Sequence, residues 1–313
     1  MGQLRRDYVL DKWVIIAEDR GRRPHQLKQG AIDKKVDVCY FCPGNENMTP
    51  PEIMRVGSDG GWQMRVFPNK FAAVTTDSSP EMKLDSPFVH SDNFGKHEVI
   101  VETPDHEKEL SDLSPDDMVQ LLKIYNERIS EIEKMDGVEY VQVFKNHGAA
   151  AGTSLIHSHS QVIATNKVPF WVGKKVDAIY ENGRCPYCMV IERESKEVRK
   201  IEENSTFMAF CPYASEFLLE AWIMPKRHVR RLDDLTDTEL YDMALLLKKI
   251  LARLREINAP FNYWIHYAPK GKEMHLQLII APRLALWAGF EFSGTIINSM
   301  SPEKAAAWYR GEE

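Results

Sequence analysis

Residues 146–161 read NHGAAAGTSLIHSHSQ and lie between two runs that predict β-strands. The first run, 138–144, alternates apolar and polar residues, and the second, 161–164, is mainly apolar. Between them, residues 148–152 are only glycine and alanine, so the backbone can approach a bulky ligand closely. The stretch therefore predicts two strands joined by a loop that can hold a ligand.

The loop ends in His157, His159 and Gln161. Alternate residues of an extended segment share a face, so we expect these three side chains to point the same way. Two imidazoles and an amide on one face suit a bound phosphate, with one imidazole as nucleophile and the amide as donor to a phosphoryl oxygen. Two histidines at alternate positions can also be surface residues or a metal pair.

The whole stretch resembles the active-site segment of galactose-1-phosphate uridylyltransferases, the nucleotidyl-transferring branch of the histidine-triad superfamily. The shared pattern is N-x-G-A-A-x-G-x-S-x-x-H-x-H-x-Q, and it fixes residue types across the segment. The resemblance implies that His159 is the nucleophile and that the main-chain carbonyl of His157 fixes its tautomer. It also implies that Gln161 and Ser154 donate to phosphoryl oxygens, and that Asn146 and Gly148 hold the loop or the phosphate.

Length and composition indicate an ordinary soluble globular protein. The 313 residues suffice for two domains, with 43% hydrophobic and 27% charged residues. A net charge of -6 argues against general nucleic-acid binding. The apolar runs are too short to span a bilayer, and the first residues lack the apolar core of a signal peptide. We therefore expect a cytoplasmic protein that binds neither membranes nor nucleic acids.

Four of the five cysteines form two C-x-x-C pairs, Cys39 with Cys42 and Cys185 with Cys188, which leaves Cys211 over. In a reducing compartment such pairs are metal half-sites or redox pairs rather than structural disulfides. A redox pair would need a thioredoxin-like context, which the sequence does not indicate. The pairs therefore predict metal binding.

The sequence also contains an internal repeat. The second C-x-x-C answers the first, residues 222–228 answer 100–106, and residues 275–280 answer 157–162. Ser114 and Thr236, two expected helix caps, each follow the repeated histidine by eight residues. The long period fits an ancient duplication better than a solenoid.

We therefore predict an α+β fold made of two tandem histidine-triad-like units, each a mainly antiparallel sheet with a long helix. The first unit spans residues 1–170 and carries the H-x-H-x-Q motif, and the second spans 171–313. Where the first copy has His159, the second has Gln277. Only the first copy thus keeps a candidate nucleophile.

Each copy offers two thiolates and two imidazoles, a set that suits tetrahedral Zn²⁺. One predicted site consists of Cys39, Cys42, His106 and His157, and the other of Cys185, Cys188, His228 and His275. Four protein ligands close the shell, so both sites are expected to be structural. The first set resembles the structural zinc site of the uridylyltransferases. The other set is more similar to the branch of the family that includes plant ADP-glucose phosphorylases.

Four other histidines compete for such roles. His90, His97, His147 and His266 are expected to have ordinary surface or packing roles.

Further substrate-binding residues follow from the resemblance. Arg20 and Arg23 fit an R-x-x-R-P element that contacts the nucleotide, although a solvated turn is the alternative. Asn69 belongs to a P-N-x-F-A element of the nucleotide pocket, or to a simple turn. Glu291 fits a residue that binds sugar hydroxyls, or is an exposed charge. The basic-aromatic pair that hexose-binding relatives carry before it is replaced here by Ala285 and Leu286.

The function that these features predict is nucleotidyl transfer by double displacement. The expected activity is that of a UDP-glucose–hexose-1-phosphate uridylyltransferase, with galactose-1-phosphate as the acceptor. The alternative is an ADP-glucose phosphorylase, which uses inorganic phosphate. A histidine-triad hydrolase would have a third histidine at Gln161. A zinc-stabilised, non-enzymatic nucleotide-binding protein is the alternative from another class. Members of the family are commonly homodimers with shared active sites.

Overall fold

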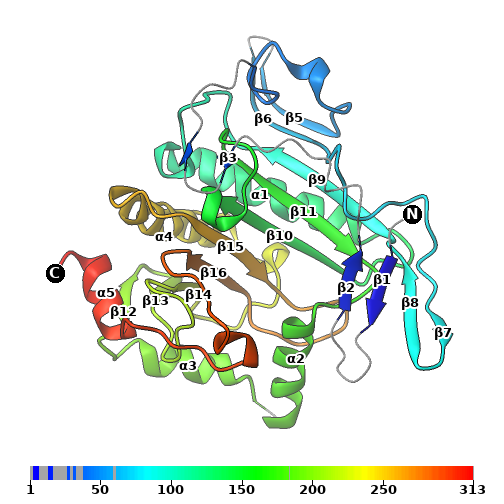
Figure 1. Ribbon diagram of the computed structural model, residues 1–313. Coiled ribbons are helices and arrows are strands. Elements are labelled where there is room, and N and C mark those ends of the chain that lie inside the picture. Colours follow the sequence, from blue (N-terminus) through cyan, green and yellow to red (C-terminus); the bar gives the residue numbers. More distant parts are fainter. Residues whose placement is uncertain are drawn as a thin grey trace.

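A ten-stranded antiparallel sheet forms the centre of the computed structural model (Figure 1). The structure describes residues 3–6, 13–16, 27–28, 31–32, 38–58, 61–182 and 184–312. From one edge to the other, the strands are β12 (Lys200–Glu203), β13 (Phe207–Phe210), β14 (Ala221–Pro225), β16 (Gln277–Pro282), β15 (Phe261–His266), β10 (Tyr140–His147), β11 (His159–Thr165), β9 (Gly95–Val101), β6 (Gly61–Pro68) and β5 (Met54–Ser58).

Two smaller sheets and five α-helices in the described residues are the other main elements of the fold. One sheet has the order β2 (Trp13–Ile16), β1 (Gln3–Arg6), β8 (Phe88–Asp92) and β7 (Lys83–Asp85), and the other pairs β3 (Leu27–Lys28) with β4 (Ala31–Ile32). The helices are α1 (Pro115–Ile132), α2 (Phe170–Asn182), α3 (Pro186–Glu194), α4 (Asp237–Glu256) and α5 (Pro302–Arg310). No helix in the described part of the chain has the length and apolarity that crossing a membrane requires.

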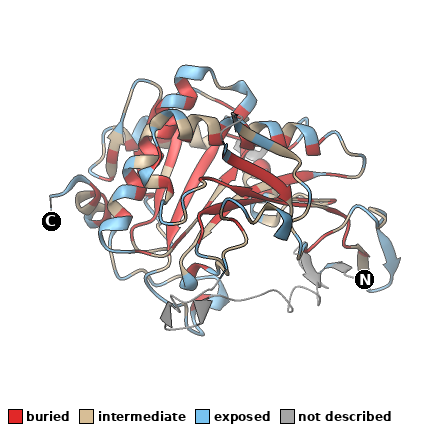
Figure 2. Ribbon diagram, turned by 90° about the horizontal axis from the view of Figure 1, so that it is seen from above, coloured by how far each residue is buried: buried red, intermediate tan, exposed pale blue. Residues whose placement is uncertain are grey.

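The long helices α1 and α4 begin where the sequence predicts. The Ser114 hydroxyl accepts from the Asp117 amide at 3.1 Å, and the Thr236 hydroxyl accepts from the Glu239 amide at 3.3 Å. In both cases the acidic side chain returns a hydrogen bond to the backbone N–H of the cap residue. The two helices pack against each other and against the sheet. Figure 2 shows the buried strands beneath the helices.

The two repeats meet at strands β10 and β15, which pair antiparallel with Phe144 opposite Trp264. Outward from this junction the first half runs β10, β11, β9, β6, β5 and the second runs β15, β16, β14, β13, β12. The halves thus repeat the same order about a local two-fold relation. This confirms the α+β fold with two units, each with a mainly antiparallel sheet and a long helix. The strands of the two units form one continuous sheet. A boundary between residues 170 and 171 would fall within the first turn of α2.

Strand alternation decides which face of the sheet carries the H-x-H-x-Q motif. Ser160 accepts a hydrogen bond from the Tyr125 hydroxyl of α1 at 2.8 Å, so it points toward the helices. Its neighbours His159 and Gln161 therefore point to the opposite face. That face, away from α1 and α4, carries the candidate site.

Candidate active site

A cavity of about 170 Å³ lies on this face. The residues around it include four of the predicted site residues, namely Asn69, Ser154, His159 and Gln161. Gly152, Thr153 and Lys70 add polar or backbone groups, whereas Phe41, Phe67, Phe71 and Leu155 supply apolar walls. A few polar groups within an apolar wall are typical of a ligand pocket.

His159 is buried and held in one orientation. Its Nδ1 lies 2.8 Å from the main-chain oxygen of His157, the contact that the family resemblance implies. A carbonyl oxygen only accepts, so the proton is on Nδ1 and the lone pair of Nε2 is free. Burial, with a smaller contribution from Lys145, lowers the pKa of His159 to about 4. The ring is therefore a neutral base at pH 7, as a nucleophile must be.

A buried ion pair lies beside this strand, and the sequence reasoning did not identify it. Lys145 Nζ is 2.6 Å from the Glu102 carboxylate, 3.0 Å from the Ser158 hydroxyl and 3.1 Å from the His159 carbonyl oxygen. The side chains of Lys145 and Glu102 are 2% and 0% exposed. The sequence contains a signal for this ion pair, because Glu102 and Lys145 each follow apolar residues of a predicted strand.

Gln161 is fixed by residues of two other segments. Its Oε1 lies 3.0 Å from Nε2 of His97 and 3.4 Å from Nδ2 of Asn69. Asn69 also accepts from the Phe71 amide at 2.9 Å, so it forms the turn and also lines the pocket. His97, expected to have an ordinary surface or packing role, is buried and contacts the predicted site residue Gln161.

Asn146 and Gly148 tie the small-residue loop to the second unit. Asn262 Nδ2 donates to Asn146 Oδ1 and to the Ala151 carbonyl, both at 2.8 Å. Gly148 has a φ of +82°, and a Cβ there would lie 2.8 Å from the Cβ of Pro260. Both residues therefore position the loop, whereas Ser154 faces the cavity.

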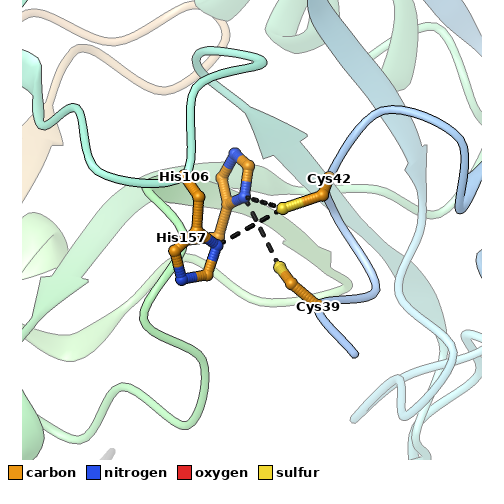
Figure 3. A group of neighbouring side chains, drawn as sticks. All are labelled: Cys39, Cys42, His106 and His157. Carbon is orange, nitrogen blue, oxygen red and sulfur yellow. Dashed lines mark hydrogen bonds between the residues drawn. The ribbon is translucent and has the colours of Figure 1, made fainter. Parts of the chain in front are cut away.

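The first predicted metal site assembles from three separate segments, with Cys39 and Cys42 in one turn (Figure 3). His157 Nδ1 lies 3.5 Å from Cys39 Sγ and 3.6 Å from Cys42 Sγ, and His106 Nδ1 lies 3.4 Å from Cys42 Sγ. Ligands on a tetrahedral zinc ion are separated by about 3.4–3.8 Å. His157 Nε2 donates to the Thr103 carbonyl at 2.7 Å, which leaves Nδ1 as a free ligand atom.

The second predicted set repeats this arrangement. Cys188 Sγ lies 3.3 Å from His228 Nδ1 and 3.6 Å from His275 Nδ1, with Cys185 in the same group. His275 Nε2 donates to the Pro225 carbonyl at 2.9 Å. The chain therefore contains two separate Cys2His2 groups that can each hold a metal ion.

At the position that corresponds to His159, the second unit has Gln277 and an added cation. Lys175 Nζ of α2 donates to Gln277 Oε1 at 2.6 Å and lies 3.0 Å from Nδ1 of His266. The ammonium also lies 5.4 Å from the ring centre of Trp222. The second unit therefore has no imidazole at the position of the candidate nucleophile, because residue 277 is a glutamine.

Three further residues, Arg20, Arg23 and Glu291, were predicted to bind substrate. Arg20 and Arg23 lie outside the described residues. Glu291 is buried, its carboxylate accepts from the Ala288 amide at 2.9 Å, and it is not among the described residues that line the cavity.

Comparison with known proteins agrees with this geometry. The N-terminal-domain model of galactose-1-phosphate uridyl transferase matches residues 2–169, and a model described as a domain of unknown function matches residues 94–307. The chain is 36% identical to the ADP-glucose phosphorylase of Arabidopsis thaliana, over 97% of this chain and 91% of the relative. It is 29% identical to the galactose-1-phosphate uridylyltransferase of Haemophilus influenzae, over 95% of this chain and 90% of the relative.

Among solved structures, a crystal structure of an ADP-glucose phosphorylase from Arabidopsis thaliana with bound ADP-glucose matches with a TM-score of 0.78. The identity is 34%, and the match covers 99% of this chain and 98% of that chain. The matches in sequence and in structure thus extend over almost the whole chain. The chain belongs to the galactose-1-phosphate uridylyltransferase family.

Proposed function

We propose that the protein is a nucleotidyltransferase that works by double displacement through His159. The observation that carries the proposal is a neutral, buried imidazole with Nδ1 bonded to the His157 carbonyl oxygen, in a cavity beside Gln161. Nε2 attacks the α-phosphorus of a nucleotide sugar, the bond to the bridging oxygen breaks, and sugar-1-phosphate leaves. A phosphate oxygen of the acceptor then attacks the same phosphorus, and the P–N bond breaks.

The other predicted site residues take supporting roles. The amide of Gln161 and the hydroxyl of Ser154 donate to the phosphoryl oxygens as negative charge develops. Asn69, which lines the cavity, contacts the nucleotide. Arg20 and Arg23 bind the nucleotide phosphates, and Glu291 binds sugar hydroxyls.

Two substrate pairs are supported by different observations. UDP-glucose with galactose-1-phosphate is supported by the uridylyltransferase family model over residues 2–169. ADP-glucose with inorganic phosphate is supported by the 36% identity to a plant ADP-glucose phosphorylase. The replacement of the basic-aromatic pair by Ala285 and Leu286 also favours this second pair.

Both Cys2His2 groups are proposed to hold structural Zn²⁺. Two thiolates and two imidazoles with the measured spacing fit this ion, and four protein ligands leave no place for a catalytic water. In the first group the metal would hold His157, whose carbonyl oxygen orients His159. Its role in the reaction is therefore to position the nucleophile.

The deciding experiment traps a labelled nucleotidyl–enzyme adduct. The wild-type protein is incubated with UDP-glucose or ADP-glucose labelled in the α-phosphate, with and without the matching acceptor. We expect one donor to label the protein, and the acceptor to discharge the label. His159→Gly should not be labelled and should lose turnover by many orders of magnitude, because nucleophile knockouts cost on the order of a millionfold.

Gln161→Ala provides a graded comparison, with a loss of roughly a hundredfold, as for one charge-stabilising donor. Binding of nucleotide sugar without any adduct or turnover would instead support a non-enzymatic, zinc-stabilised nucleotide-binding protein. An adduct on His159→Gly would rule out the central role of this residue.

We also propose that the protein is a cytoplasmic homodimer, as is common in the family. Leu286, Phe290 and Phe292 are large apolar side chains that lie exposed near the predicted sugar-binding Glu291. Light scattering coupled to size exclusion measures the mass of the particle in solution. A monomer at micromolar concentration would contradict the dimer.

A further inference from the structure

The Gln161 amide can present either its NH2 group or its oxygen to the cavity, and only the NH2 group can donate to a phosphoryl oxygen. We propose that His97 makes this choice, as a positioning residue that holds the Gln161 oxygen and directs the NH2 group to the substrate. The inference rests on the proposed role of Gln161 in nucleotidyl transfer.

Main-chain amides set the direction of these hydrogen bonds. The backbone N–H of Ala73 lies 3.2 Å from His97 Nδ1, and a backbone amide can only donate. In the neutral ring the proton is therefore on Nε2, which lies 3.0 Å from Gln161 Oε1. Gln161 Oε1 is then the acceptor, and its NH2 group is turned away from His97.

Asn69 is a second donor to the Gln161 oxygen, and a main-chain amide fixes its orientation as well. Its Oδ1 accepts from the Phe71 amide at 2.9 Å, which assigns Nδ2 as the other end of the side chain. Nδ2 lies 3.4 Å from the same Gln161 oxygen. Two donors, each oriented by the backbone of residues 71–73, thus converge on one atom of Gln161.

Burial makes this orientation exclusive. His97 is 3% exposed and Gln161 is 8% exposed, so water cannot readily replace a lost protein partner. A flipped Gln161 amide would bring its NH2 group against two other donors and would leave all three without an acceptor. The Gln161 oxygen would then face the phosphoryl oxygens and repel them.

The second unit lacks this polar arrangement. Gln161 pairs with Phe144, and Ile279 pairs with Trp264, while Phe144 and Trp264 oppose each other at the junction of the units. Ile279 therefore takes the strand position of Gln161. The second unit thus forms the same sheet without a glutamine at this position. The amide occurs only in the unit that carries the candidate nucleophile.

Two substitutions of His97 separate its contact with the Ala73 amide from its contact with Gln161. His97→Asn places a side-chain oxygen near the position of Nδ1, so it keeps the acceptor for Ala73 but removes the donor to Gln161. His97→Gln places an NH2 group near the position of Nε2, so it keeps the donor to Gln161 but removes the acceptor for Ala73. Comparing the two distinguishes positioning of Gln161 from packing.

The assay uses whichever of UDP-glucose or ADP-glucose the wild-type protein turns over, with kcat, KM and the midpoint of thermal unfolding measured for each variant. We expect His97→Asn to lower kcat roughly ten- to hundredfold, near the effect of one lost donor, with little change in KM. His97→Gln should recover most of kcat. In a Gln161→Ala background, His97→Asn should have no further effect, because the residue acts through Gln161.

The outcomes separate this inference from the proposed function. Normal turnover of Gln161→Ala would overturn the role of Gln161 itself. Slow Gln161→Ala with normal His97→Asn would overturn the role of His97 alone. Equal losses in both His97 variants, tracking a lower unfolding midpoint, would also overturn it, since His97 would then act only through packing.

Discussion

Lys145 Nζ lies 3.1 Å from the carbonyl oxygen of His159, and its charge is balanced by Glu102 at 2.6 Å. The pair joins strand β10 to the segment after β9 and to the main chain of the predicted nucleophile. In the second unit, the strand position after the junction residue is Ile265 instead of Lys145, and Gln277 stands in place of His159. The lysine of the buried ion pair therefore occurs only in the unit that carries the candidate nucleophile.

Lys145→Met should strongly destabilise the fold. The substitution leaves the fully buried Glu102 carboxylate without its cation, a change that costs about 3–5 kcal/mol in other proteins. Urea unfolding gives the difference in the free energy of unfolding. The double variant Lys145→Met/Glu102→Leu removes both charges and should recover much of the loss. A Lys145→Met variant as stable as the wild type would contradict this reading of the pair.

Metal content should report the two Cys2His2 groups independently. We expect about two zinc ions per chain in protein purified without chelator, and about one in either Cys39→Ser or Cys188→Ser. Cys39→Ser should also destabilise the fold, because site formation and folding are coupled. Cys211→Ser is the matched control, since Cys211 is buried elsewhere and belongs to neither group. Elemental analysis that finds a single ion in the wild type would count against the second site.

Local signals in the sequence were enough to predict several parts of this molecule. The caps Ser114 and Thr236 are set by neighbouring residues, and the spacing of Cys39 and Cys42 is fixed within one turn. The repeat then related the two units to each other. These features need no knowledge of how distant strands pair.

Other parts depend on pairing across long stretches of chain. Lys145 and Glu102 are 43 positions apart, and His97 and Gln161 are 64 apart. A single sequence does not say which strands adjoin, so neither contact followed from the residue pattern. The continuity of the sheet through β10 and β15 was hidden for the same reason.

Gly148→Ala should affect both stability and turnover. The residue has a φ of +82°, and an added Cβ would meet Pro260 at 2.8 Å. Gly271→Ala is the control for a positive φ alone, because its φ is +67° and nothing lies within 4 Å of the added atom, whereas the ψ of 156° at Gly148 adds strain of its own. We expect the control to lose about 1–2 kcal/mol of unfolding free energy and Gly148→Ala to lose more. Equal losses in calorimetry would mean that both the backbone strain at Gly148 and the contact with Pro260 are easily relieved.

Lys175 should make stability rise with pH in the alkaline range. Burial lowers the pKa of this lysine to about 8, despite the opposing influence of Glu220 and Glu216. An unfolded lysine titrates near 10.4, so between these values the unfolded state binds more protons. Stability should therefore increase as pH rises from about 8 to 10.4, by on the order of 1–3 kcal/mol.

Other groups titrate over the same range, so the measured quantity is a difference between two proteins. Lys175→Met removes the titrating group and keeps much of the apolar stem against Trp222, which lies 5.4 Å from the ammonium. Its advantage over the wild type should be largest below pH 8, where the wild type holds a buried charge, and should shrink toward pH 10.4 as that charge is lost. Urea unfolding of both proteins from pH 7 to 10.5 gives this difference. A difference independent of pH would mean that Lys175 titrates normally in the folded protein.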